Sequence, residues 1–392
     1  MIAWGGAVCV TLYLASLATK YCLSRYYLAR NQDDGGRAES PDVAVLRPIL
    51  SGDPLLESTL RRSVSSSESP TRFWLLVDRD DHEGRRVAQA IAMELESVVQ
   101  VEVCPPPEQG QNPKAAKLDH VLPLVDAPYV AVLDDDTWLS CDNLRKAIAR
   151  LESGCDLYTG LPLYFSAAGF WSQLVTHFVN NNSVMTYLSL LPVTGPITIN
   201  GMFYVAQTSV MRELGGWGAL GEQLCDDLAI AQAFLTSGRR VYQGVTPQFL
   251  TTTVEDRGAY ISLMQRWYLF AEVLLDAQPA PRKLLIVALL ALPPVMLWGS
   301  ILLLASSAFG LGALMIALVL RDAAIRDLMR RVCDHPPRLS WWRSIVAELV
   351  QPLHWAHAKV SKRITWRNRR IVAHADGSFD YLDQHESAVE TH

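Results

Sequence analysis

Three consecutive aspartates, Asp134 to Asp136, follow directly on the apolar stretch 130–133, which predicts a buried strand. Like charges this close are costly unless a cation or strong hydrogen-bond donors neutralise them. Asp134 and Asp136 are separated by one residue, so both could approach one divalent ion around a tight turn. Carboxylates suit Mg²⁺ or Mn²⁺, which substrate phosphates often help to bind. The pattern predicts a metal–diphosphate site. The alternative is a solvated acidic turn before a helix over 141–153.

Further acids stand where predicted elements begin or end. Asp78 ends a predicted strand over 73–78 and could meet a nucleobase or ribose. Asp226 and Asp227 open an apolar helix within 225–238, after the glycine-rich stretch 215–221. Acids at a helix start often serve only as caps. They could equally present a carboxylate into a pocket.

The elements that must position these acids alternate between strand and helix. Apolar runs at 43–50, 73–78, 98–104 and 129–134 are separated by stretches that suit helices. This alternation predicts an α/β fold with a mostly parallel sheet, whose ligand groups lie at the carboxyl ends of the strands. We place the catalytic domain at 43–256, after a polar linker over 28–42.

Two apolar regions predict membrane segments. Residues 2–19 carry no charge and are followed by basic residues, so 1–27 is expected to be an uncleaved anchor with the catalytic domain on the cytoplasmic side. Residues 284–320 also lack charge and suit a hairpin of two short helices, with a turn near 306–312; a dip into one leaflet is the alternative. An amphipathic interfacial segment over 257–283 precedes the hairpin. A basic tail over 321–392 follows it.

The composition indicates which partner to expect and whether the cysteines form disulfides. No nucleic-acid recognition motif is present, and the basic residues lie beside apolar runs, so we expect a membrane partner and no nucleic acid. The seven cysteines are scattered and form no CxxC pair, which predicts reduced thiols in a cytosolic region.

Seven stretches, taken in order, resemble one family. They are RPILSGDPLLESTL (47–60), VDRDD (77–81), GQNPKAAKLDHVLP (110–123), LDDDT (133–137), VTGPITINGMFYVAQTSVMRELGGW (193–217), CDDLAIAQAF (225–234) and LMQRW (263–267). Together they resemble the inverting, lipid-directed glycosyltransferases of GT-A fold, in particular the ceramide glucosyltransferase group. Leu263 stands where that family's last motif begins with Gln or Arg.

The resemblance implies roles for individual residues. A UDP-sugar donor would meet Pro48 and Asp78 at its uridine, and Lys114, Arg266 and the metal-binding acids Asp134 and Asp136 at its diphosphate. A lipid hydroxyl would be the acceptor, with Trp267 beside it. Asp227 would be the general base, and Asp226 is the alternative.

The sequence leaves three alternatives: another lipid acceptor, a polysaccharide synthase and a non-enzymatic scaffold. The lipid could be a hopanoid or another alcohol instead of ceramide. A polysaccharide synthase of the same superfamily would need more membrane helices for its channel. A non-enzymatic scaffold would not need several intact acidic motifs.

Overall fold

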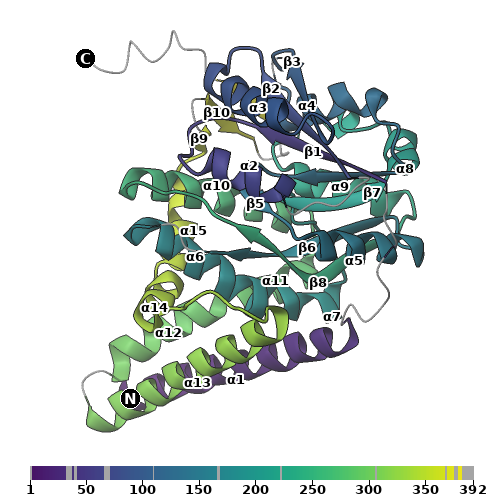
Figure 1. Cartoon of the computed structure of the whole chain (residues 1–392). Coiled ribbons are helices and arrows are strands. Elements are labelled where there is room, and N and C mark those ends of the chain that lie inside the picture. Colours follow the sequence, from purple (N-terminus) through teal and green to yellow (C-terminus); the bar gives the residue numbers. More distant parts are fainter. Residues whose placement is uncertain are drawn as a thin grey trace, which may run out of the picture. The chain divides into compact units, whose positions relative to one another are not determined.

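The computed structural model describes residues 2–31, 38, 42–65, 71–108, 110–165, 168–220, 223–304, 307–366, 369–374 and 378–381. The chain forms two compact units, and each gathers stretches that are far apart in the sequence (Figure 1). The helical unit consists of Met1–Gln32, Leu163–Gly195 and Val254–Val360. The sheet unit consists of Asp33–Pro162, Pro196–Thr253 and Ser361–His392.

Eight strands form one mixed sheet in the order β3-β2-β1-β4-β7-β6-β8-β5. The first four of these are parallel, and helices connect them along the chain. The elements of this half are β1 (Val43–Ile49), α2 (Leu56–Ser65), β2 (Arg72–Asp78), α3 (His82–Glu94), β3 (Val99–Cys104), α4 (Pro113–Val121), η1 (Leu122–Leu124) and β4 (Tyr129–Leu133). The predicted alternation of strands and helices, and with it the α/β class, is confirmed.

Alternating side chains of the strands build the two faces of this sheet. Val43 and Val45 of β1 belong to one buried cluster, which includes Leu60 of α2. Ala44 and Leu46 belong to a second buried cluster, with residues of α4. Successive side chains of a strand point to opposite faces, so an unbroken apolar strand such as β1 requires cover on both sides.

The other half of the sheet contains antiparallel pairs, which the sequence analysis left unassigned. β7 runs antiparallel to β4, and Leu133 lies opposite Phe203. The end of β4 therefore meets the segment that leads into β7, and the Asp134 amide donates to the Met202 carbonyl (3.0 Å). The elements of this half are β5 (Thr137–Trp138), α5 (Cys141–Glu152), β6 (Leu157–Tyr164), β7 (Phe203–Gln207), α8 (Thr208–Glu213), η3 (Gly218–Leu220), α9 (Asp226–Thr236) and β8 (Val241–Leu250).

The helical unit holds the apolar helices. Its elements are α1 (Ile2–Arg30), α6 (Phe170–Asn182), the π-helical turn η2 (Ser183–Tyr187), α7 (Leu188–Thr194), α10 (Arg257–Asp276), α11 (Ala280–Leu290), α12 (Leu292–Leu304), α13 (Ala308–Val332), α14 (Trp341–Leu349) and α15 (Gln351–Val360). α1 approaches α12 closely at Gly6, where a Cβ would lie 2.4 Å from a Leu304 methyl carbon. Small residues permit such contacts between apolar helices.

Two described helices, α1 and α13, are long and apolar enough to cross a membrane. α11 and α12 pass the same test only as a pair, which is bent by 41°. This pair is either a broken span or a re-entrant loop, so both readings of the predicted hairpin stay open. Of the predicted turn, residue 306 lies outside the described residues. The rest is corrected: Ser307 caps α13, so 309–312 lie within the start of that helix.

The C-terminal stretch divides between the two units. α14 and α15 belong to the helical unit, whereas Ser361–His392 belong to the sheet unit. There, β9 (Arg363–Trp366), β10 (Arg369–Ala373) and β11 (Phe379–Tyr381) form a small antiparallel sheet. Leu163–Gly195, which fall inside the stretch expected for the catalytic domain, group with the apolar helices.

Candidate active site

The aspartate turn follows β4, and a buried arginine of β1 holds it. The Arg47 guanidinium is fully buried, and its Nη2 donates to the carbonyls of Asp134 (2.8 Å), Asp135 (3.3 Å) and Thr137 (2.7 Å). Burial lowers the pKa of Arg47 to about 10, and the three aspartates oppose that shift. Arg47 therefore stays charged at neutral pH and offsets the acidic turn.

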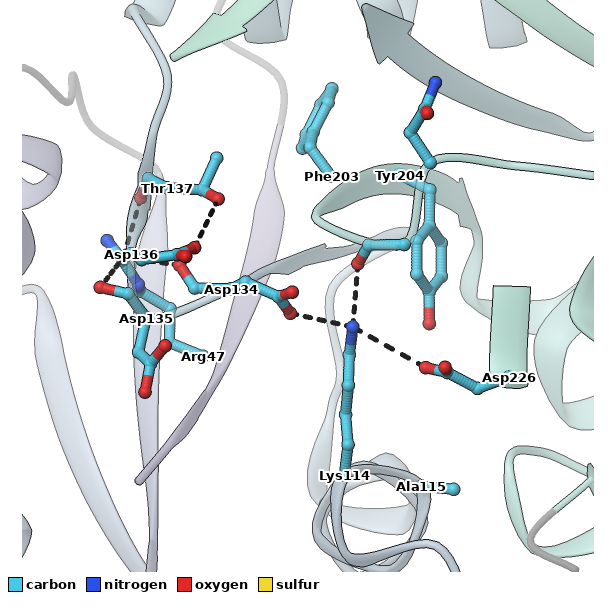
Figure 2. Close-up of polar contacts among 12 residues, drawn as sticks. Arg47, Lys114, Ala115, Asp134, Asp135, Asp136, Thr137, Phe203, Tyr204 and Asp226 are labelled. Atoms are coloured by element: carbon cyan, nitrogen blue, oxygen red, sulfur yellow. Dashed lines mark hydrogen bonds and ion pairs between the residues drawn. The ribbon is translucent and has the colours of Figure 1, made fainter. Parts of the chain in front are cut away.

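The three carboxylates take different directions from this turn (Figure 2). Asp135 is buried and accepts from the Leu50 amide (3.0 Å), which ties the turn to the end of β1. Asp136 accepts from the hydroxyls of Thr137 (3.1 Å) and Thr252 (2.6 Å). Asp134 reaches the cluster of charged residues described next.

Lys114 lies at the centre of that cluster. Its ammonium contacts an Asp134 oxygen (2.7 Å), the Gly201 carbonyl (2.8 Å) and an Asp226 oxygen (3.6 Å), as Figure 2 shows. The sequence Asn112-Pro113 explains its position: Asn112 caps α4 by accepting from the Lys114 amide, and proline suits the first turn of a helix. Lys114 is thus fixed beneath the end of β4.

Asp226 and Asp227 belong to the first turn of α9, and the cap of that helix has no side-chain hydrogen bond. Asp227 lies against Gly201. A Cβ on Gly201 would stand only 1.7 Å from an Asp227 carboxylate oxygen. Glycine is therefore required at position 201 for this carboxylate to occupy its place.

Burial and like charge set the protonation of this cluster. Burial and the neighbouring Asp226 carboxylate raise the pKa of Asp227 from 3.8 to about 8, although Lys114 opposes the shift. Burial lowers the pKa of Lys114, but the surrounding aspartates outweigh it and hold that pKa well above its usual value. The site therefore combines a permanent cation with a carboxyl that titrates near neutral pH, a combination common in acid–base catalysis.

A second buried pair joins the ends of β1 and β2. Lys117 contacts Asp78 (2.9 Å) and donates to the Ile49 carbonyl (2.6 Å), and both charged side chains are almost fully buried. Asp78 is thus a partner of Lys117, and its contact with a nucleotide stays a prediction. Pro48, which lies beside Ile49 in β1, is partly buried.

Arg266 and Trp267 belong to α10 in the helical unit, whereas the Lys114 cluster belongs to the sheet unit. The Trp267 ring stacks on Phe178 of α6, with 6.0 Å between ring centroids. The roles predicted for Arg266 and Trp267 stay predictions.

A divalent ion held by Asp134 and Asp136 and shared with a diphosphate stays a prediction. Both residues supply hard oxygen ligands from one turn, and the Thr252 hydroxyl orients Asp136 as an outer-shell partner would. Among the residues that the structure describes, no three or more His, Cys, Asp or Glu side chains form a complete metal site.

Sequence analysis missed the roles of three residues. Arg47 and Gly201 lie within stretches that carried the family resemblance, but nothing in those stretches predicts the contacts with the acidic turn and Asp227. Lys117 had a visible signal, because it stands three residues after Lys114 and shares its side of α4.

Comparison with known proteins shows the family and the fold of this chain. The model of glycosyl transferase family 21 matches residues 8–379. The chain is similar to the mannosyltransferase PcManGT from Pyrobaculum calidifontis, solved with GDP-Man and Mn2+, at 14% identity and a TM-score of 0.54, covering 92% of this chain and 98% of that one. At this identity the likeness shows the fold alone.

Two further solved structures have lower scores. GalNAc-T7 with UDP, GalNAc and Mn2+ matches at 12% identity and a TM-score of 0.39, over 61% of this chain and 52% of that one. TarS 1–349 of S. aureus with UDP-GlcNAc matches at 10% identity and a TM-score of 0.38, over 87% of this chain and 99% of that one. These scores are too low to compare folds.

The family match covers most of the chain, and the predicted resemblance is confirmed. The chain therefore belongs to glycosyl transferase family 21, the ceramide glucosyltransferase family, and is a GT-A hexosyltransferase that uses a nucleotide sugar.

Proposed function

We propose that this enzyme transfers a sugar from a UDP-sugar to the hydroxyl of a membrane lipid, with inversion at the anomeric carbon. The observation that carries the proposal is the cluster in which Lys114 joins Asp134 to Asp226, with Asp227 held nearby against Gly201. It combines a cation for a diphosphate with a carboxyl suited to take up a proton.

Asp227 is the general base of the proposed reaction. Its carboxylate takes the proton of the lipid hydroxyl while that oxygen forms a bond with the anomeric carbon. The bond from this carbon to the diphosphate breaks in the same step, and UDP leaves with the bonding electrons. A single in-line displacement inverts the configuration. A positioned base typically contributes a factor of roughly 10²–10⁴ to the rate.

Positively charged groups stabilise the negative charge of the UDP that leaves. Lys114 releases part of its contact with Asp134 and Asp226 to bind phosphate oxygens as a point charge. Arg266 is proposed as a second, bidentate contact to the diphosphate. A Mg²⁺ or Mn²⁺ ion held by Asp134 and Asp136 would neutralise the departing diphosphate.

The buried pair of Lys117 and Asp78 holds the ends of β1 and β2 beside Pro48, where we place the uridine. Trp267 is proposed to line the acceptor site. The apolar helices α1 and α13 support membrane association. The basic residues that follow 2–19 favour a cytoplasmic catalytic domain, the compartment that holds soluble sugar nucleotides.

The acceptor class can be tested with purified enzyme, a panel of UDP-sugars and total lipid extract. We expect one labelled product in the organic phase, and mass spectrometry will identify the lipid as ceramide, hopanoid or another alcohol. The anomeric proton coupling in its NMR spectrum should show inversion. A water-soluble or insoluble polymer instead of a lipid product would favour a polysaccharide synthase and contradict the proposal.

A further inference from the structure

A polar cavity lies inside the helical unit, away from every residue used above. It has a volume of about 450 Å³, including its open mouth. Its lining includes apolar residues and six polar or charged ones that concern us: Tyr13 and Lys20 of α1, Asn181 of α6, Arg321 of α13, Glu348 of α14, and Gln351 of α15. Ionisable side chains within apolar helices are costly and usually have a functional partner.

One of the two cations in this cavity, Arg321, pairs with groups of the protein itself. The Nε of Arg321 binds a Glu348 oxygen, its Nη1 donates to the Ser344 hydroxyl (2.8 Å) and its Nη2 donates to the Ser344 carbonyl (3.0 Å). The Tyr13 hydroxyl donates to the same Glu348 oxygen (3.4 Å). Glu348 therefore balances the charge of Arg321. The lining of this cavity contains no other carboxylate.

The second cation, Lys20, has no such partner. Its side chain is only 8% exposed, yet no described residue makes an ion pair or hydrogen bond with its ammonium. With Lys20 and Arg321 against Glu348, the cavity keeps one net positive charge. Burial of an uncompensated ammonium is unfavourable unless an anion accompanies it.

The surroundings indicate which anion this is. α1 exposes Val8 and Leu12, and α13 exposes Met315, Ile316 and Val319. Acyl chains could cover these side chains while a headgroup enters the cavity. We propose that this cavity binds the phosphate of an anionic membrane phospholipid, with Lys20 as its principal contact. The phosphodiester carries one negative charge, which matches the excess of one cation. This inference does not depend on the glycosyl-transfer reaction.

The first test measures binding to the full chain. Native mass spectrometry of the protein purified in a neutral detergent should retain one phosphatidylglycerol per chain after its addition. Phosphatidylcholine should be retained at least tenfold less. Absence of any retained phosphatidylglycerol, or equal retention of both lipids, would overturn the proposal.

The second test uses matched variants and thermal unfolding. Lys20→Met should abolish the rise in Tm that short-chain phosphatidylglycerol causes in the wild type, whereas Lys20→Arg should keep it. Lys283→Met is the control, because Lys283 is an exposed residue of α11 that pairs with Asp276. If Lys20→Met does not fold, the comparison of Lys20→Arg with Lys20→Gln in the first test replaces it.

Inorganic phosphate separates the two sources of this anion. Phosphate alone should raise Tm far less than phosphatidylglycerol at the same concentration, because it does not cover the apolar helices. An equal rise with phosphate would overturn the assignment to a lipid. A phosphatidylglycerol response in Lys20→Met equal to that of the wild type would refute the role of Lys20.

Discussion

Replacement of Asp227 by asparagine preserves the size of the side chain but removes its ability to take up a proton. If Asp227 is the base, transfer should fall by about 10²–10⁴-fold, the usual contribution of such a group. Binding of the UDP-sugar should change little, because Lys114 and Asp134 remain. Asp226→Asn is the matched control, since Asp226 lies one residue away and contacts Lys114 directly.

The raised pKa gives this prediction a second, independent readout. Burial beside Asp226 raises the pKa of Asp227 to about 8. At pH 7 only about one carboxyl in ten is then ionised, since each pH unit below the pKa reduces that fraction about tenfold. The kcat/KM of the wild type should rise about tenfold per unit between pH 6 and 7 and level off above pH 8. The asparagine variant should lose this rise.

The assay is transfer of labelled sugar into the organic phase between pH 5.5 and 9.5, with UDP-sugar affinity measured in parallel. Equal turnover of wild type and Asp227→Asn would refute the reasoning. So would a wild-type profile without a rise in this range. Asp226→Asn should move the rise to lower pH, because it removes a carboxylate that raises the pKa of Asp227. Loss of transfer at every pH in Asp226→Asn but not in Asp227→Asn would make Asp226 the base.

The same carboxyl links stability to pH. Its pKa is higher in the folded state, about 8, than the usual 3.8, so the folded protein holds a proton that the unfolded chain releases between these values. This contribution to the free energy of unfolding therefore falls as pH rises from about 4 to about 8. Relative to the wild type, the Tm of Asp227→Asn should increase with pH over this range. Parallel Tm curves would contradict the assigned environment.

Three other predictions follow from the same site. Gly201→Ala should displace the Asp227 carboxylate and lower transfer by about 10²-fold, the scale of a misplaced catalytic group, whereas Gly312→Ala, whose Cβ meets nothing within 4 Å, should not. Lys117→Met should leave Asp78 buried without its cation and reduce the free energy of unfolding by about 3–5 kcal/mol in chemical denaturation; a loss below about 1 kcal/mol would contradict that pairing. Removal of divalent cations by a chelator should lower transfer, and Mn²⁺ or Mg²⁺ should restore it; unchanged transfer would contradict a metal at Asp134.

The parallel half of the fold could be predicted because its strands are continuous apolar runs. Val43–Ile49 is one such run, and the stretches suited to helices between these runs predicted the α/β class. The antiparallel half was harder to predict. β5 has only two residues and depends on β8, which follows about a hundred residues later in the chain. Pairing over such separations leaves little local signal.

In the candidate site, too, some features could be predicted from local sequence and others could not. Asp134 was predicted from its own neighbours, because an acidic run after a buried strand is unusual. Its contact with Lys114 depends on how α4 lies against the sheet, which spacing does not reveal. The fit of Gly201 against Asp227 depends on the approach of α9 to the segment before β7. Such contacts arise from tertiary packing, so the sequence suggested the participants but not their geometry.

The most direct test of the central claim measures UDP release from a UDP-sugar by purified enzyme, with and without lipid acceptor. The account predicts slow release that lipid stimulates, and loss of both activities in Asp134→Ala, since Asp134 links Lys114 to the proposed diphosphate site. Release by Asp134→Ala at the wild-type rate, with lipid stimulation intact, would contradict it.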